Sequence, residues 1–366
     1  MSDRSAIEWT DATWNPTRGC SRVSPGCANC YAEREAHRHD HPGGAYEGLT
    51  KQTKAGPRWT GRVIAAKHKL FEPLTWKRPR RIFVNSMSDL FHEDLPDDAI
   101  VDAFAVMAMN PRHTFQVLTK RADRMRKWFF LVRDGFETAR RVGLRALDFT
   151  CQFVADGLTF TSSTGKIDRD GSTLPWPLPN VWLGVSVENQ EWADKRVPDL
   201  LETPAAVRFL SCEPVLGPID LANIRLPGAG FIDALEGLGH DGTEMDGYAY
   251  PALDWVIAGG ESGPGARPMH PDWARTLRDQ CAGAEIPFFF KQWGEWLPGD
   301  QEPPALAPHS LDKQHIRWID VAGGVHKIGL VQKVEGHTLT MRVGKKAAGR
   351  LLDGRQHNEF PQPVPR

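Results

Sequence analysis

The sequence contains no apolar run that approaches the ~20 residues a membrane-spanning helix needs, although 40% of its 366 residues are hydrophobic. Its first residues also lack the basic start and the apolar stretch of a secretory signal peptide. We therefore expect no membrane span and a cytoplasmic location.

An excess of charge of one sign is also missing. The chain carries 45 Lys and Arg residues against 46 Asp and Glu residues, so the formal net charge is −1. Whole-protein electrostatics therefore give no argument for a protein that coats nucleic acid or binds a membrane surface. A local basic groove stays open, because composition says nothing about where charges gather.

Cysteine is scarce, with six residues in the whole chain. A secreted disulfide framework is normally denser than this. Cys151, Cys212 and Cys281 are scattered, whereas the other three lie together at positions 20, 27 and 30. Such clustering indicates metal binding rather than disulfide pairing.

What the sequence does contain is a series of short apolar segments that each end in polar residues. Six of them are clear: 81–91, 113–121, 180–189, 206–214, 254–263 and 286–296. Plausible helices lie between several of them, at 97–110, 191–204 and 270–283. Apolar strands that alternate with helices indicate a parallel sheet. With one more strand near the cysteines, we expect an α/β fold, a partial or complete (β/α) barrel, with an open doubly wound sheet as the alternative.

Two segments interrupt this rhythm, and a tail follows it. Residues 131–178 alternate like a β-hairpin around the turn GKIDRDGS, and residues 218–252 resemble an insertion with a loop. A Pro-rich stretch after residue 300 leads to a β-rich segment that ends in a short helix with Lys345 and Lys346. We therefore expect a barrel over residues 1–300 and a small C-terminal appendix over 301–366.

The cysteine cluster has the form C-x6-C-x2-C, with Cys20, Cys27 and Cys30 around a Ser-Pro-Gly loop. Thiolates suit soft metal centres, and structural zinc normally takes four closed ligands. A [4Fe–4S] cluster held by three cysteines instead leaves one iron open, as reductive cleavage of S-adenosylmethionine requires. The alternative is a Cys3His zinc site completed by one histidine of the segment 37–41.

The three-cysteine loop ahead of a series of βα units resembles the radical S-adenosylmethionine superfamily. The spacing departs from the usual C-x3-C-x2-C, and Tyr31 follows the third cysteine where the usual aromatic residue precedes it. The whole chain more closely resembles the phage-associated three-cysteine-motif family, whose activity is not settled. The matching segments are IEWTDATWNPTRGCSRVSPGCANCYAE, FVNSMSDLFHEDLP, FQVLTKR, WLGVSVEN, RFLSCEPVLG, WVIAGGESGPGARPM, FFFKQWGEW and GKKAAGRLLDGR.

The resemblance implies an enzyme in which a reduced [4Fe–4S] cluster on the three cysteines cleaves S-adenosylmethionine to a 5′-deoxyadenosyl radical. It also implies an electron donor, and we expect a three-cysteine-motif protein as a partner. The residues that would contact the cofactor lie at the strand ends: Asn85, Ser86, Ser88, Asp89, Lys120, Ser186 and Glu188. Helix capping by Ser88 and Asp89, and a solvated Lys120, are the structural alternatives.

Two further positions follow from the chemistry of their segments. The segment AGGESGPGARP matches neither G-x-G-x-x-G nor the phosphate loop, but its glycines let a turn approach a ligand, and we expect Glu261 to contact the cofactor. Cys212 ends a central strand, and its thiol would donate a hydrogen atom to a substrate radical, as in related repair enzymes. A free cysteine is otherwise a small buried hydrophobe.

The substrate is expected to be a nucleobase, nucleotide or nucleic acid, an analogy based on the phage-associated family, the aromatic content and the basic tail. A second hypothesis is a zinc-stabilised protein without catalysis that binds nucleic acid or a partner protein. A third is an enzyme whose cluster is only structural or redox-sensing.

Overall fold

A computed structural model describes residues 5–130, 136–155, 174–226, 228, 230–240, 248–301, 315–327 and 336–362. In these segments every helix is too short or too polar to reach across a lipid bilayer.

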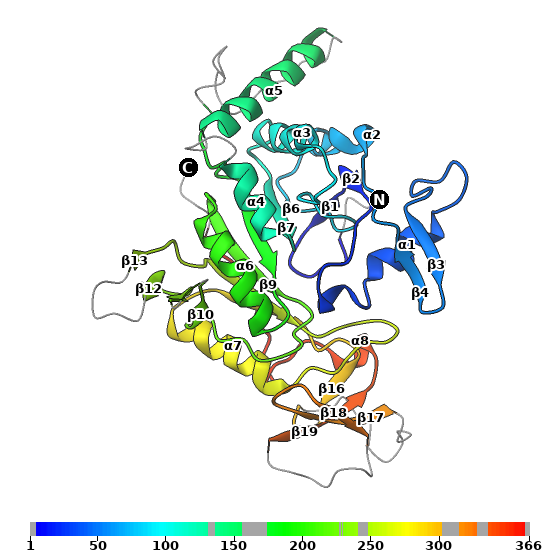
Figure 1. The fold of residues 1–366 in the computed structure, drawn as a ribbon, viewed down its shortest axis with the longest axis vertical. Coiled ribbons are helices and arrows are strands. Elements are labelled where there is room, and N and C mark those ends of the chain that lie inside the picture. Colours follow the sequence, from blue (N-terminus) through cyan, green and yellow to red (C-terminus); the bar gives the residue numbers. More distant parts are fainter. Residues whose placement is uncertain are drawn as a thin grey trace.

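The centre of the fold is a curled sheet of seven parallel strands that forms a half-barrel (Figure 1). Its order follows the chain: β1 (Ala12–Trp14), β6 (Arg81–Val84), β7 (Thr114–Thr119), β8 (Val181–Ser186), β9 (Val207–Cys212), β14 (Trp255–Gly259) and β15 (Phe288–Gln292). All seven expected strands are confirmed. A doubly wound sheet reverses its strand order at a switch point. This sheet has no reversal, so the expectation of a partial barrel holds and the alternative is wrong.

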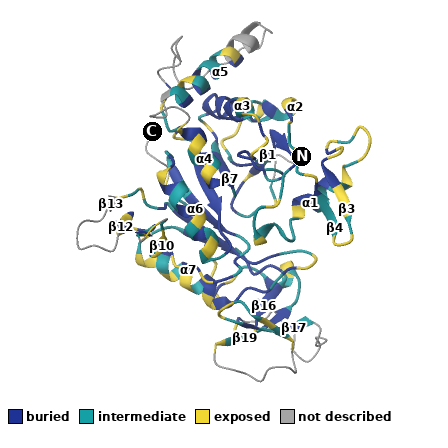
Figure 2. Ribbon diagram, in the orientation of Figure 1, coloured by how far each residue is buried: buried dark blue, intermediate teal, exposed yellow. Residues whose placement is uncertain are grey.

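Each strand presents alternate side chains to the two faces of the sheet, as the pleat requires. On the outer face, residues such as Ile82, Leu210 and Val256 pack in the main core with the helices. The helices that contribute most of this layer are α3 (Asp97–Ala108), α4 (Ala122–Phe129), α6 (Gln190–Glu202) and α7 (Pro271–Gly283). Figure 2 shows the buried residues running through the sheet and the helix surfaces that face it.

Local sequence sets where these helices begin. Asn189 caps α6 by accepting a hydrogen bond from the Trp192 amide, and Pro271 occupies the first turn of α7. Within α7 the buried residues Trp273, Leu277 and Cys281 recur every four positions, which turns one face of the helix toward the sheet.

The other face of the sheet carries a cluster of aromatic side chains, which we call the aromatic floor: Trp9, Phe83, Trp182, Phe209, Trp255 and Phe289. The Trp9 and Phe83 rings lie 4.8 Å apart, and the Trp182 and Trp255 rings 5.9 Å apart. Most of these residues belong to the first halves of their strands, so the floor fills the half-barrel below the carboxyl ends of the strands.

The C-terminal segment closes the outer edge of β15. The Phe290 amide donates to the His357 carbonyl at 3.0 Å, and the Trp255 indole donates to the Glu359 carbonyl at 2.9 Å. Phe360 then stacks on the aromatic floor, with its ring 5.1 Å from that of Trp255. An unpaired sheet edge is a template for association, and here the chain covers its own.

Smaller elements surround the half-barrel. Beside the cysteines lie β2 (Thr17–Arg18), β5 (Ile64–Ala65), the hairpin β3 (Thr50–Thr53) with β4 (Gly56–Trp59), α1 (Tyr31–Arg38) and α2 (Lys67–Leu70). Residues 218–252 hold a small antiparallel sheet of β10 (Ile224–Arg225), β11 (Phe231–Asp233), β12 (Leu238–His240) and β13 (Tyr248–Ala249). A third sheet contains β16 (Trp296–Pro298), β17 (Ile316–Asp320), β18 (Val325–Lys327) and β19 (His337–Arg342), and α8 (Lys345–Ala348) follows it.

The hairpin expected over residues 131–178 is wrong in the part that the structure describes. Helix α5 (Phe136–Ala155) occupies it, and α5 packs on α3. Its buried residues Val142, Ala146 and Phe149 are spaced by four and three positions, a helical period that outweighs the short-range alternation. The expected GKIDRDGS turn lies outside the described residues.

We predict that Gly184→Ala destabilises the protein. A Cβ atom on Gly184 would lie 2.5 Å from the ring of Phe209 in the aromatic floor, so the ring must shift inside a packed cluster. Overpacking of this kind costs about 1–3 kcal/mol of unfolding free energy, measurable by urea denaturation.

Gly283→Ala is the matched control, because nothing lies within 4 Å of a Cβ atom at the end of α7. That variant should unfold at the wild-type urea concentration or slightly above it. Equal midpoints for the two variants would contradict the packing described for Gly184.

Candidate functional site

A cavity of about 460 Å³ opens above the aromatic floor, at the carboxyl ends of the parallel strands. This is the position where (β/α) folds place their ligands. Ten of the twelve expected site residues line it: Cys20, Cys27, Cys30, Asn85, Ser86, Ser88, Asp89, Lys120, Ser186 and Glu261.

The cysteines lie on a loop, residues 20–30, that leads into α1; we call it the cysteine loop. Cys27 ends a single 3₁₀ turn, η1 (Pro25–Cys27), and Cys30 is the residue before α1. Burial raises the pKa of Cys20 to about 12. Burial also raises the pKa of Cys30, although the Ala32 and Glu33 amides donate to its sulfur and act in the opposite direction. Soft metal centres bind thiolates, so metal binding here must displace protons.

Glu188 holds the middle of the cysteine loop. Its side chain is fully buried, and its Oε1 accepts a hydrogen bond of 2.6 Å from the Ser24 hydroxyl. Arg196 from α6 donates to Oε2 at 3.1 Å and balances the charge. Gly26 passes so close that a Cβ atom there would lie 2.2 Å from Oε1. Glu188 is therefore a partner of the loop and lies outside the cavity lining.

Glu261 holds the end of the same loop. Its Oε2 accepts a hydrogen bond of 2.9 Å from the Asn29 side chain. Arg267 donates to Oε1 at 2.6 Å and reaches the Pro25 carbonyl at 3.0 Å. Glu261 thus lines the cavity while its oxygens bind the chain itself.

Arg121 holds the beginning of the loop. It donates to the Ser21 hydroxyl at 2.7 Å and to Asp89 at 3.0 Å, and its Nη1 lies 3.8 Å from the Cys20 sulfur. Asp89 also accepts hydrogen bonds from the Thr119 hydroxyl at 2.7 Å and from the Lys120 amide at 3.0 Å. Asp89, which follows β6, therefore links its segment to the end of β7 and, through Arg121, to the cysteine loop.

Asn85 differs from these carboxylates because one of its polar atoms is free. The residue has a φ of 62°, a left-handed conformation that asparagine tolerates better than most side chains. Its Nδ2 donates to the Thr17 hydroxyl at 2.8 Å, whereas the buried Oδ1 has no partner among the described residues. Ser86 bonds Asn15 and Ser88 bonds Thr17, so both hydroxyls bind the segment that precedes the cysteines.

Several lining residues were not selected from the sequence. Lys291 forms an ion pair of 3.0 Å with Glu213, which also accepts from the Trp9 indole at 3.4 Å. Gln292 Oε1 and Glu8 Oε2 are buried without a partner in the described part of the chain. For Glu213 the sequence did contain a signal. Alternate residues of a strand share a face, so Ser211 and Glu213 of the segment SCEP (211–214) point to the same side.

Cys212 lies on the opposite face from that expected. It is fully buried in the main core between the sheet and the helices, and burial raises its pKa well above the usual thiol value. Its neighbour Ser211 lines the cavity instead. The structure therefore does not bring Cys212 together with the other candidate residues.

The spacing of the thiols bears on the metal they suit. One zinc ion with Zn–S bonds of ~2.3 Å brings its sulfur ligands to about 4 Å from one another. Across the described segments, one group of three or more His, Cys, Asp or Glu side chains has all its ligand atoms within 4.8 Å, and it does not include these cysteines. As the side chains stand, the three sulfurs are therefore not all within 4.8 Å of one another, and a cluster, which spreads its ligands over different iron atoms, would accept this spacing without rotation of the thiols.

The histidines considered for a zinc site have other contacts. The His37 imidazole bonds the Thr50 hydroxyl at 2.8 Å, and His39 lies 3.6 Å from Glu35. His41 lies near the Pro42 carbonyl on an exposed turn.

Comparison with known families gives one result. A family model described as "Protein of unknown function (DUF5131)" matches residues 4–361. Neither a curated protein nor a solved structure matches the chain.

We predict that Gly26→Ala loosens the cysteine loop. Because Glu188 is fixed by Arg196 and fully buried, the clash is relieved by movement of the loop. Amide hydrogens of residues 20–30 should exchange at least ~10-fold faster, equivalent to about 1.4 kcal/mol of local stability. Mass spectrometry of the exchanged protein measures this, with Gly283→Ala as control. Unchanged exchange in the loop would show that Glu188 does not anchor it.

Proposed function

We propose that this chain, which belongs to the DUF5131 family of proteins of unknown function, is a radical S-adenosylmethionine enzyme. Its three-thiol loop would hold a [4Fe–4S] cluster, and the cavity would hold S-adenosylmethionine and substrate. The observation that carries the proposal is the position of the three cysteines, which line one cavity at the carboxyl ends of the strands.

The donor set fits such a cluster. Three thiols of one loop that line the same cavity would bind three irons of such a cluster and leave the fourth iron open. When bound and reduced, such a cluster would supply the one electron with which the sulfonium of S-adenosylmethionine is cleaved to methionine and a 5′-deoxyadenosyl radical. The chain keeps the thiols in place through Arg121, Glu188 and Glu261, and an electron-donor protein must supply the reductant.

The cavity offers the groups that an amino acid and a nucleoside need. Lys120 and Lys291 line the cavity and would bind a ligand carboxylate in addition to Glu188, 3.8 Å from Lys120, and Glu213, 3.0 Å from Lys291. The unpaired oxygens of Asn85 and Gln292 provide acceptors for an ammonium or an amine. Leaving these buried oxygens without a donor costs free energy, which a bound ligand recovers. The volume of about 460 Å³ lies within the ~300–1,000 Å³ typical of ligand pockets.

For the substrate we propose a nucleobase, free or within a nucleic acid. Lys345 lines the cavity from the C-terminal side and lies 3.4 Å from Glu8. Together with Lys120 and Lys291 it makes three cations around an acceptor-rich cavity whose wall includes Trp9 and Phe83. Cations and aromatic faces are the groups that bind nucleotides. A three-cysteine-motif partner protein stays part of this proposal.

We predict that anaerobic reconstitution with iron and sulfide gives about four of each per chain. After reduction with dithionite, addition of S-adenosylmethionine should yield 5′-deoxyadenosine and methionine, measured by chromatography. Nucleosides and oligonucleotides added to the same assay should accelerate 5′-deoxyadenosine formation if they are substrates.

Cys27→Ala and Cys212→Ala form a matched pair, since each removes one thiol. Cys27→Ala should lose the cluster and the cleavage, whereas Cys212→Ala should keep both, because Cys212 lies in the core. Zinc in place of iron that is lost in Cys27→Ala, without cofactor cleavage in the unchanged protein, would overturn the enzyme proposal in favour of the zinc-stabilised binding protein.

A further inference from the structure

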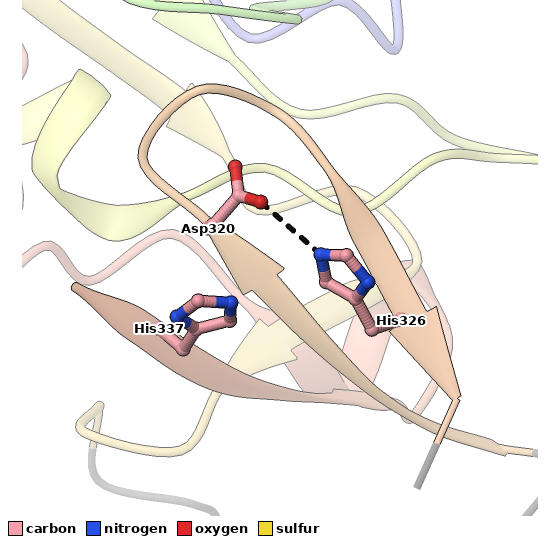
Figure 3. Close-up of side chains that lie close together, drawn as sticks. All are labelled: Asp320, His326 and His337. Atoms are coloured by element: carbon pink, nitrogen blue, oxygen red, sulfur yellow. Dashed lines mark hydrogen bonds and ion pairs between the residues drawn. The ribbon is translucent and has the colours of Figure 1, made fainter. Parts of the chain in front are cut away.

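Three metal-ligating side chains converge on the C-terminal sheet, away from the residues discussed so far. Asp320 ends β17, His326 is the middle residue of β18, and His337 begins β19. The strand register pairs Asp320 with His337 and Trp318 with His326. Because side chains two positions apart on a strand share a face, all three project from the same face of the sheet (Figure 3).

Their separations suit a single metal ion. One ligand atom from each residue lies within 4.8 Å of the other two. His326 Nε2 is 3.1 Å from Asp320 Oδ2, and the two imidazole rings are 5.5 Å apart. Two ligands on one tetrahedral zinc, at ~2.0–2.2 Å from the metal, lie about 3.3 Å apart. Rotations of the His337 side chain cover the remaining distance.

The surrounding backbone leaves room for the site. The Gly324 amide donates to Asp320 Oδ1 at 2.8 Å, so Oδ2 is turned toward His326. A Cβ atom on Gly324 would lie 2.4 Å from Oδ2 and 3.0 Å from His326 Nε2. A glycine therefore stands where a larger residue would fill the space between the two ligands.

One imidazole has an unsatisfied atom. His337 Nδ1 is buried and has no hydrogen-bond partner among the residues that the structure describes. A buried polar atom without a partner is costly, and coordination to a cation is one way to satisfy the ring.

From this arrangement we propose a divalent transition-metal site formed by Asp320, His326 and His337, with zinc as the ion. Two imidazoles and one carboxylate select zinc and its neighbours over magnesium or calcium, which prefer oxygen ligands only. The His326 side chain is 37% exposed, so the ion has access and water can take its fourth position. The ion joins β17, β18 and β19, and the site is independent of the function proposed for the cysteine loop.

The test uses the full chain with Cys20, Cys27 and Cys30 changed to Ser, so that the thiols do not compete for metal. Cobalt(II) titrated into this protein should give the weak visible absorption of nitrogen and oxygen ligands, saturating at about one ion per chain. Zinc should displace the cobalt and raise the thermal unfolding midpoint, because it binds the folded state.

Asp320→Asn, His337→Gln and Gly324→Ala should each weaken the binding of cobalt. Loss of outer partners alone costs ~10–100-fold in metal affinity, so loss of a ligand should cost at least ~100-fold. Asp320→Asn keeps an acceptor for the Gly324 amide, so it removes the negative charge of the ligand without removing the hydrogen bond that holds the turn. The control is His41→Ala, an exposed histidine outside the group.

Two outcomes would overturn the proposal. Either the protein with Cys20, Cys27 and Cys30 changed to Ser binds no cobalt, or the three variants bind it as tightly as His41→Ala does. The contact between Asp320 and His326 would then be a plain ion pair.

Discussion

The arrangement of the site depends on two buried carboxylates, Glu188 and Glu261. They lie two residues beyond the ends of β8 and β14. A buried charge without partners is expensive, so each must be neutralised and hydrogen-bonded. Arg196 and Arg267 supply the charge, and the cysteine loop supplies the remaining donors through Ser24 and Asn29. The hydrogen bonds that satisfy these two buried carboxylates therefore also hold the cysteine loop in place. Arg121 repeats this arrangement at the start of the loop.

Much of the fold could be predicted because its signals are local. Continuous apolar segments followed by polar residues identified six strands of the sheet, and a seventh was expected near the cysteines. The carboxyl ends of the strands placed seven of the expected site residues around one cavity, together with the three cysteines of the loop. Helix α5 was missed because a short alternation of apolar and polar residues was interpreted as a hairpin. The spacing of the apolar residues distinguishes a helix from a hairpin, and Val142, Ala146 and Phe149 have the helical spacing.

The roles within the site were harder to predict, since they depend on partners distant in sequence. Ser24 and Glu188 are separated by 164 residues, and Asn29 and Glu261 by 232. No local pattern shows that these carboxylates bind the chain instead of a ligand. For Cys212 the difficulty was to predict which face of β9 it occupies. Neighbouring residues of a strand point to opposite faces, so Ser211 lines the cavity and Cys212 lies in the core. Glu8 and Lys345 reach the cavity from opposite ends of the chain.

The covered edge of β15 has a consequence for how the protein is made. Residues 357–360 complete that edge and place Phe360 on the aromatic floor, next to the rings of Trp255 and Phe289. During synthesis these residues leave the ribosome after all seven strands of the sheet. Until then the nascent chain exposes an unpaired strand edge beside an incomplete aromatic cluster, a surface of the kind that chaperones bind.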